Sequence, residues 1–149
     1  MKKLFFTALL AASVAASALA TEKNSVNTAA VSNFESLFSK ATAVKWTEKK
    51  DYLKATFVLD NVRMEALYSP LGDLIGTTKG ITLDELPVSA KRTLAKKFGS
   101  FTVKEAVRFE GADEGAYFIY GENEKETLVL KVSDDSNVST VKSIRKQSA

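Results

Sequence analysis

From Ala43 to Thr78, the apolar residues of this chain recur at every second position, and this alternation limits the possible folds more than any other feature. Apolar and mixed side chains alternate from Leu53 to Leu59 and again from Val62 to Tyr68, with Asp60-Asn61 between the two runs. A period of two on both sides of a tight turn predicts an antiparallel hairpin with one apolar face. A further strand is predicted on each side of this hairpin, Val44 to Trp46 before it and Leu74 to Thr78 after it.

Two segments show helical spacing instead. Residues 29–41 carry an apolar stripe and follow the possible cap residues Asn27 and Thr28, which predicts a short amphipathic helix. A second helix is predicted from Pro87, with acidic residues near its start and basic residues near its end. The stripe of the first helix is Val31, Phe34, Leu37 and Phe38, and that of the second is Leu86, Ala90, Leu94 and Phe98.

The strand pattern then returns, which indicates an internal repeat. Met64-x-Ala66-x-Tyr68-Ser69 matches residues 128–133 at an offset of 64, and Tyr52 matches Tyr117 at an offset of 65. We therefore expect an α+β fold in which tandem helix-plus-four-strand units, 29–80 and 81–145, form one antiparallel sheet with the helices packed on one face. The strands predicted for the second unit are Phe101 to Glu110, Gly115 to Gly121, Thr127 to Val132 and Val138 to Ile144.

The N-terminus has the features of an export signal. Lys2 and Lys3 precede an apolar run from Leu4 to Val14, and Ala18-Leu19-Ala20 is a small-x-small cleavage sequence. This order predicts a signal peptide over residues 1–20, cleaved after Ala20, and hence a periplasmic or secreted protein without stable membrane insertion after cleavage. Residues 21–28 are polar and predict a flexible leader, so that the single folded domain is expected over 29–149.

The short motifs of this chain resemble those of the PepSY-like, β-lactamase-inhibitor-like family of exported bacterial proteins. The resemblance runs from about Phe34 to Arg145. Ser69-Pro70-Leu71 stands where the family usually has an acidic turn, which argues against a cation-binding loop there. The motifs that carry the resemblance are Ala43-Val44-Lys45-Trp46, Tyr52 to Phe57, Leu67 to Leu74, and Leu86-Pro87.

The resemblance implies a fold and a class of function. It implies tandem units that form one antiparallel sheet with helices on one face and a concave open face on the other. Similar folds include a secreted inhibitor of β-lactamases, and PepSY modules occur in the propeptides of peptidases. Because function depends on the site and not on the fold, the inhibited target does not follow from this resemblance.

Composition excludes much chemistry. The 149 residues contain no Cys and no His, which excludes disulfides, thiolate or imidazole metal ligands and His-dependent nucleophilic catalysis. The turn Asp134 to Asn137 carries oxygen ligands, but its spacing is typical of a turn and does not match a calcium loop. Removal of residues 1–20 lowers the formal charge from +3 to +1, which disfavours nucleic-acid binding. We expect no catalytic residues, no cofactor and no metal.

The open face of the predicted sheet is the candidate binding surface. The pattern predicts that Leu53, Ala55, Phe57, Phe118 and Tyr120 point toward the helices. Their neighbours then point away, and exposed Tyr and Arg beside aliphatic residues are typical of interface hot spots, although the same residue types also favour ordinary strands. The candidate residues for binding a partner are Tyr52, Lys54, Arg63, Leu67, Arg108, Tyr117 and Ile119.

We therefore expect a non-enzymatic binding module whose partner is an envelope or secreted protein or peptide, with inhibition or sequestration of an envelope hydrolase as one form of this function. The alternative is a carrier of a small ligand in a pocket between helices and sheet. That alternative predicts a cavity lined by Phe34, Phe38, Leu94 and Phe98, and close packing of these side chains would count against it.

Overall fold

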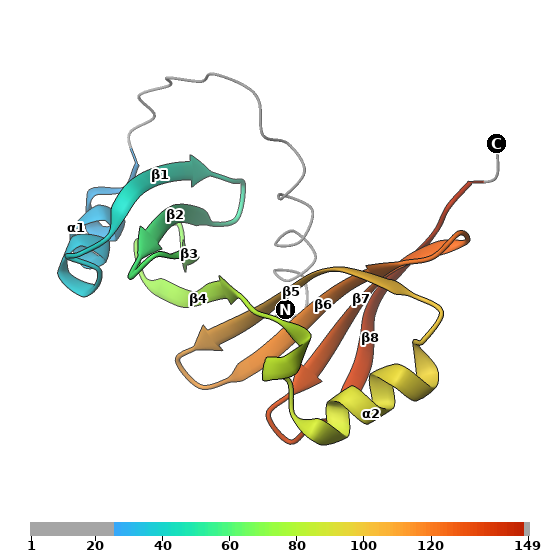
Figure 1. The fold of residues 1–149 in the computed structure, drawn as a ribbon. Helices are drawn as coiled ribbons and strands as arrows, with labels where there is room; N and C mark the ends of the chain where they lie inside the picture. The colour runs from blue at the N-terminus through green and yellow to red at the C-terminus, as the bar shows by residue number, and fades with distance from the viewer. Residues whose placement is uncertain (1–25, 148–149) are drawn as a thin grey trace.

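The computed structural model describes residues 26–147, which form one eight-stranded antiparallel sheet and two α-helices (Figure 1). The predicted signal peptide, its cleavage site and residues 21–25 of the predicted leader lie outside these residues. The strands are hydrogen-bonded in chain order, so the sheet is a meander of an α+β protein. The helices are α1 (Thr28–Leu37) and α2 (Val88–Lys97), and a 3₁₀ turn, Leu83–Glu85, precedes α2. The strands are β1 (Thr42–Glu48), β2 (Leu53–Leu59), β3 (Val62–Tyr68), β4 (Leu74–Gly80), β5 (Thr102–Gly111), β6 (Gly115–Glu122), β7 (Glu126–Ser133) and β8 (Val138–Arg145).

Both helices lie on the same face of the sheet. Paired residues of neighbouring antiparallel strands point to the same side. Phe57 packs in the cluster that contains Phe34 of α1, and Tyr117 packs in the cluster that contains Ala90 of α2. We call this side the helix-bearing face. Figure 1 shows α1 near β1 to β3 and α2 near β5 to β8. One row of paired residues connects the two clusters: Phe57, Met64, Lys79, Arg108, Tyr117 and Val132.

The opposite side, which we call the helix-free face, carries a third apolar cluster. It is marked by a second row of paired residues that runs Thr56, Glu65, Thr78, Phe109, Ala116 and Ser133. Among the described residues, no side chain of α1 or α2 belongs to the cluster on this face. Its buried members are Tyr52, Leu67, Val107, Phe109, Ala116, Phe118 and Val129.

Phe109 joins the two halves of the helix-free face across β4. Gly76 pairs with Leu67 of β3 on one side and with Gly111 of β5 on the other. A Cβ atom built on Gly76 would lie 2.6 Å from the ring of Phe109, and one built on Gly111 would lie 3.0 Å from it. Because neither glycine has a side chain, the Phe109 ring lies across both positions and extends the apolar cluster from β5 toward β3.

Helix α1 is shorter than the sequence predicts. It ends at Leu37 and not at Ala41, because Phe38 leaves helical geometry with φ −124° and ψ 47°. The predicted core stripe is also wrong at one position, since the side chain of Leu37 is 56% exposed. Phe34 and Phe38 turn toward the sheet as predicted. The predicted stripe is therefore a core face at Phe34 and Phe38, whereas Leu37 between them is exposed to solvent.

The start of α1 is fixed to the turn between β3 and β4. Asn27 is the N-cap, and its side-chain Oδ1 accepts a hydrogen bond from the Ala29 N–H at 2.8 Å. Its Nδ2 donates to the Pro70 carbonyl at 2.9 Å. Gly72 has φ +98°, and a Cβ there would lie 2.8 Å from the Cβ of Ala29, so only glycine allows this close approach.

Replacement of Asn27 by alanine is expected to lower the free energy of unfolding by about 1–2 kcal/mol, because it removes the cap of α1 and the hydrogen bond to Pro70 together. Equilibrium denaturation in urea measures this loss. Asn27→Asp keeps an oxygen that can cap the helix but loses the donor to Pro70, so its stability should lie between the two. An alanine variant as stable as the parent would contradict the assignment of Asn27 as an anchor.

Candidate binding surface

Four of the seven candidate residues lie on the helix-free face of β2 and β3 or directly before it. Lys54 of β2 pairs with Leu67 of β3, and Arg63 lies further along β3 on the same side. Tyr52 precedes β2 and packs in the same cluster as Leu67. The side chain of Arg63 is exposed, whereas Tyr52, Lys54 and Leu67 are buried. This group therefore has a buried apolar floor and a cation at its accessible edge.

A charged pair is set into this floor. Lys54, which is 7% exposed, places its Nζ atom 3.1 Å from Oε1 of Glu65. Burial of the Tyr52 hydroxyl and the nearby negative charge of Glu65 both raise the pKa of Tyr52, with burial as the larger cause. Removal of Glu65 would leave the Lys54 ammonium buried and unpaired, which is costly. The positions of Tyr52, Lys54 and Glu65 are therefore coupled through charge as well as packing.

The other three candidate residues do not share this face, which corrects the predicted surface. Arg108 and Tyr117 pair with each other in the row that faces the helices, and Ile119, which is 1% exposed, packs in the cluster beneath α2. Conversely, Phe118 and Tyr120, which the pattern placed toward the helices, lie with the cluster on the helix-free face.

The error has a simple physical cause. Side chains of a strand alternate between its two faces, so a shift of one residue exchanges the faces of the whole strand. An offset of 65 equates Tyr52 with Tyr117. In the structure, Leu53 and not Tyr52 lies on the same face as Tyr117, so the match at 65 assigns the residues of β6 to the wrong faces. Met64, Ala66 and Tyr68 of β3 and Leu128, Leu130 and Val132 of β7, which were matched at 64, all lie on the helix-bearing face.

Arg108 forms a network of its own on the helix-bearing face. Its Nε donates to Oε1 of Glu110 at 2.8 Å, and its Nη1 donates to Oδ1 of Asp134 at 2.6 Å. Its guanidinium carbon lies 4.6 Å from the centre of the Tyr117 ring, within the range of a cation–π contact. The hydrogen bond to Glu110 raises the pKa of Arg108 most; burial acts against it, and Asp134 adds to the rise. Arg108 is thus already engaged by three side chains of its own chain.

Two residues of the helix-free face were not among the predicted binding residues. Phe118 was expected beneath a helix, and Phe109 was not considered for this surface. Both are buried in the cluster on the helix-free face. No signal in the sequence indicates Phe109, because the pairing of Gly76 with Gly111 that leaves room for its ring is seen only in the sheet.

The four side chains that the carrier alternative placed around one cavity do not come together. Phe34 and Phe38 pack beneath α1, whereas Leu94 and Phe98 pack in the separate cluster beneath α2. Phe34 contacts Phe38, Trp46 and Phe57 with ring centres 4.9–5.6 Å apart. A groove of about 470 Å³ does lie between α1 and β1, lined by Val31, Phe34, Glu35, Phe38, Ser39, Ala41, Val44 and Trp46.

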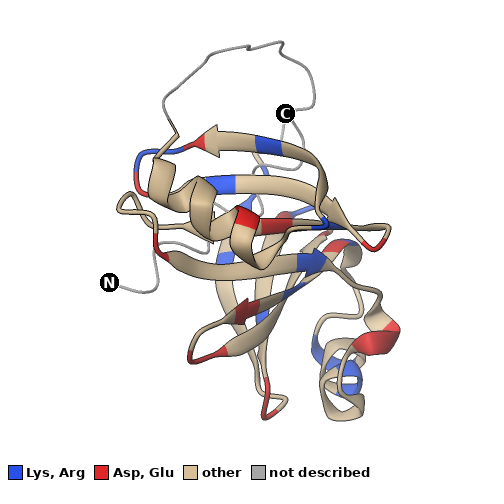
Figure 2. Cartoon of the chain, turned by 90° about the vertical axis from the view of Figure 1, so that its left-hand side faces the viewer, with Lys and Arg blue, Asp and Glu red and all other residues tan. Residues whose placement is uncertain are grey.

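Charges of both signs are spread over the described chain, as Figure 2 shows. Within residues 26–147, no three acidic side chains come close enough together to hold a metal ion. No helix in this same range has the length and apolar character needed to cross a bilayer.

Neither a protein-family model nor a curated protein matches this chain, but solved structures do. One is a protein from Bacteroides eggerthii described as "putative periplasmic", with a TM-score of 0.69 and 14% identity over 79% of this chain and 87% of that one. A DUF2874-family protein from Bacteroides uniformis has a TM-score of 0.69 and 10% identity over 79% and 88% of the two chains. A BLIP-like protein from Bacteroides fragilis has a TM-score of 0.67 and 18% identity over 80% and 87%.

At 10–18% identity, these likenesses concern the fold alone. The chain has the fold of BLIP-like and DUF2874-family proteins from Bacteroides, and one structural neighbour is described as periplasmic.

Proposed function

We propose that this protein is an exported, non-enzymatic binding module that contacts a protein or peptide across the helix-free face of β1 to β3. One observation carries the proposal. The helix-free face holds an apolar cluster that no described helix covers, with the Lys54–Glu65 pair set beside it. A buried apolar floor fixes the shape of a recognition face, and charges held at its edge can select the partner.

The accessible contacts of this surface lie at its edge. The floor residues Tyr52, Lys54 and Leu67 are buried, so they fix the shape of the face and contribute few atoms to direct contact. Arg63 of β3 and Lys45 of β1 are exposed and lie on the same side. A partner with acidic side chains opposite these cations would match the charge of the edge.

The proposed setting is the bacterial envelope. Residues 1–20 would direct export, with cleavage after Ala20, and the protein would act in the periplasm or outside the cell. We include in this proposal that the chain is PepSY-like and that it is built from two tandem units, 29–80 and 81–145. Inhibition or sequestration of an envelope hydrolase is the form that the BLIP-like fold of one neighbour favours.

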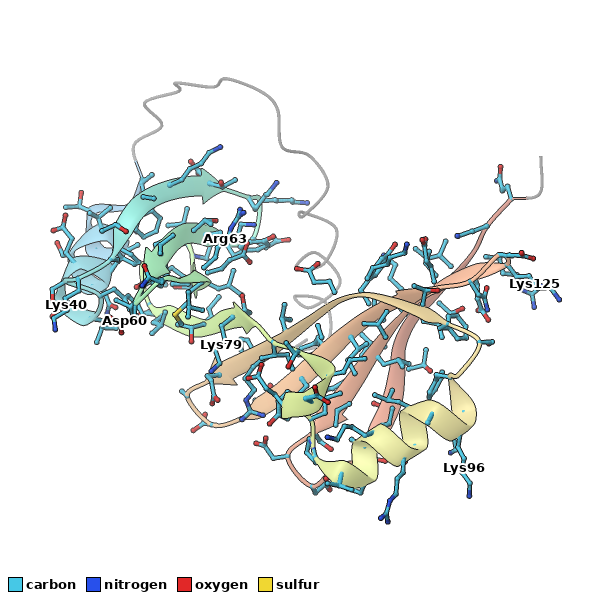
Figure 3. All side chains as sticks on the ribbon, viewed as in Figure 1. Lys40, Asp60, Arg63, Lys79, Lys96 and Lys125 are labelled. Carbon is cyan, nitrogen blue, oxygen red and sulfur yellow. The ribbon has the colours of Figure 1, made fainter. Side chains whose placement is uncertain are left out.

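Substitution Arg63→Glu is expected to abolish capture of the partner from envelope extract, because it reverses the accessible charge of the proposed face. Lys79→Glu is the matched control, since it makes a similar charge change on β4 but on the helix-bearing face. Figure 3 labels both residues. The measurement is quantitative mass spectrometry of proteins retained by each immobilised variant, followed by titration of the purified partner.

A partner lost with Arg63→Glu and retained with Lys79→Glu would support the proposed face. Loss with both variants would indicate a general charge effect, and loss with Lys79→Glu alone would place binding on the helix-bearing face. Either of these results would contradict the proposal.

A further inference from the structure

The outer edge of β1 and the groove beside it form a second surface, which shares Lys45 with the helix-free face but has its apolar groove on the helix-bearing side. β1 pairs with β2 on one side, and no strand of the described chain pairs with its other side. The groove lies between this outer strand and the second half of α1, and most of its lining is apolar or aromatic. An extended peptide can bind at such an edge through main-chain hydrogen bonds, while neighbouring grooves select its alternate side chains.

The usable part of this edge is the segment Lys45–Glu48. A bulge separates Thr42 from Lys45, and Ala43 has φ +52°, so the edge is irregular before Lys45. From Lys45 to Glu48, each residue pairs in register with β2. Trp46 faces the groove, whereas Lys45 and Thr47 face the opposite side. Because side chains of an added strand would alternate in the same way, a residue opposite Trp46 would enter the groove and its two neighbours would lie near Lys45 and Thr47.

The charge around this edge indicates which peptide would fit. Four exposed lysines lie in β1 or close to its ends, and within residues 26–147 none of them forms an ion pair. Glu48 is the one acidic residue between the first and last of them. The lysines are Lys40, Lys45, Lys49 and Lys50; Figure 3 labels Lys40 at the α1 end.

The same charge disfavours a second copy of this chain as the occupant. Pairing of two β1 edges would bring the lysines of both copies together, and like charges opposite one another destabilise a strand pair. Pairing of β1 with β8 of another copy would meet three further cations, Lys142, Arg145 and Lys146. A foreign acidic strand avoids both conflicts.

We propose that the β1 edge and the α1–β1 groove bind an extended acidic peptide of another protein, whose bulky apolar side chain enters the groove beside Trp46. The acidic residues flank that side chain and lie near Lys45. This inference goes beyond the proposed function and does not depend on it, because its apolar contact is the groove on the helix-bearing side and its main-chain contact is the outer edge of β1; Lys45 is the residue that the two surfaces share.

The test uses Trp46 as its own reporter, since it is the single tryptophan of the chain. The probe is the peptide acetyl-Thr-Val-Glu-Phe-Glu-Val-Thr-amide, added to the purified protein while Trp46 emission is recorded. We expect a saturable shift of the emission. Replacement of the peptide's Phe by Ser should weaken binding at least about tenfold, because the groove then stays unfilled.

Two variants of the protein locate the site. Val44→Asp places a charge at the mouth of the groove, at a side chain that is 42% exposed, and should weaken binding about tenfold. Val141→Asp is the matched control on the other edge strand, where the side chain is 37% exposed, and should leave binding unchanged. Lys45→Glu should weaken binding of the Glu peptide and strengthen binding of a Lys-for-Glu peptide. It tests the proposal even if Val44→Asp fails to fold.

Several results would overturn the proposal. These are no emission shift with the Phe peptide, equal binding of the Phe and Ser peptides, or equal losses in Val44→Asp and Val141→Asp. A shift produced as strongly by phenylalanine amide would assign the groove to a small apolar ligand. A Trp46 emission shift that depends on protein concentration without peptide, together with dimers in analytical ultracentrifugation, would assign the groove to a second copy of this chain. Binding of a partner at the helix-free face is measured in a different experiment, with the Arg63→Glu variant. Either proposal can therefore fail without the other.

Discussion

Gly76→Ala is expected to lower the free energy of unfolding by about 2–4 kcal/mol, which is large for the addition of one methyl group. The new Cβ would lie 2.6 Å from the Glu110 carbonyl oxygen and 2.6 Å from two atoms of the Phe109 ring. The carbonyl belongs to the backbone of β5, which pairs with β4, so it cannot move without disturbing the sheet. Phe109 is 3% exposed, so its ring can move only by displacing the side chains packed around it. Urea denaturation of the two proteins measures the difference.

Gly80→Ala is the matched control because it lies on the same strand and has nothing within 4 Å of a built Cβ. We expect a change within about 0.5 kcal/mol, since the added methyl meets no atom and the unfolded chain loses some freedom. Equal losses in the two variants would show that the effect comes from glycine in a strand and not from the Phe109 contact. A Gly76→Ala variant as stable as the parent would contradict the packing described for the helix-free face.

Local signals were sufficient to predict the strands. The Asp60-Asn61 turn illustrates why. Both residues have positive φ, 50° and 65°, as the type I′ turn of a two-residue hairpin loop requires. The alternation on each side then fixes which residues of β2 face the helix, and Leu53, Ala55 and Phe57 do so. The apolar stripe of α2 also packs against the sheet as predicted, from Leu86 to Phe98. In each case one short segment contains the whole signal.

The candidate surface was harder to predict because it depends on the relation between distant segments. Tyr52 and Tyr117 are alike in type, yet they point to opposite faces. When two similar segments differ by an insertion, the alignment between them is fixed only to within one residue. An error of one residue assigns every side chain of a strand to the opposite face of the sheet. The hydrophobic pattern of β6 gives no help, because Tyr117 and Ile119 on one face and Phe118 and Tyr120 on the other are all apolar or aromatic.

Contacts that depend on three-dimensional proximity could not be predicted at all. The position of Phe109 over Gly76 joins strands that are adjacent in the sheet but 33 residues apart in the chain. Leu37 is exposed although helical spacing groups it with Phe34 and Phe38, and Phe38 packs toward the sheet although it has left helical geometry. Helical spacing alone cannot locate the end of α1, since tertiary packing overrides local propensity.

Phe34→Ala is expected to have the largest effect of any single substitution considered, a loss of about 3–5 kcal/mol in the free energy of unfolding. Phe34 is 3% exposed and is the central ring of the cluster beneath α1. Its ring meets Phe57 edge-on at 4.9 Å and Trp46 edge-on at 5.6 Å, geometries that add to the gain from burial. Removal of the ring leaves a cavity that rigid β2 cannot close, so the loss exceeds the transfer energy of the side chain alone.

Leu37→Ala is the matched control on the same helix, because it also shortens an apolar side chain but one that is 56% exposed. A change within about 0.5 kcal/mol is expected there, as for other exposed positions. Guanidinium denaturation followed by Trp46 emission reports both variants, and circular dichroism confirms that each still folds. If Leu37→Ala were as damaging as Phe34→Ala, α1 would have to be rotated about its axis relative to the structure. The groove beside β1, which Phe34 also lines, would then not exist in the form described.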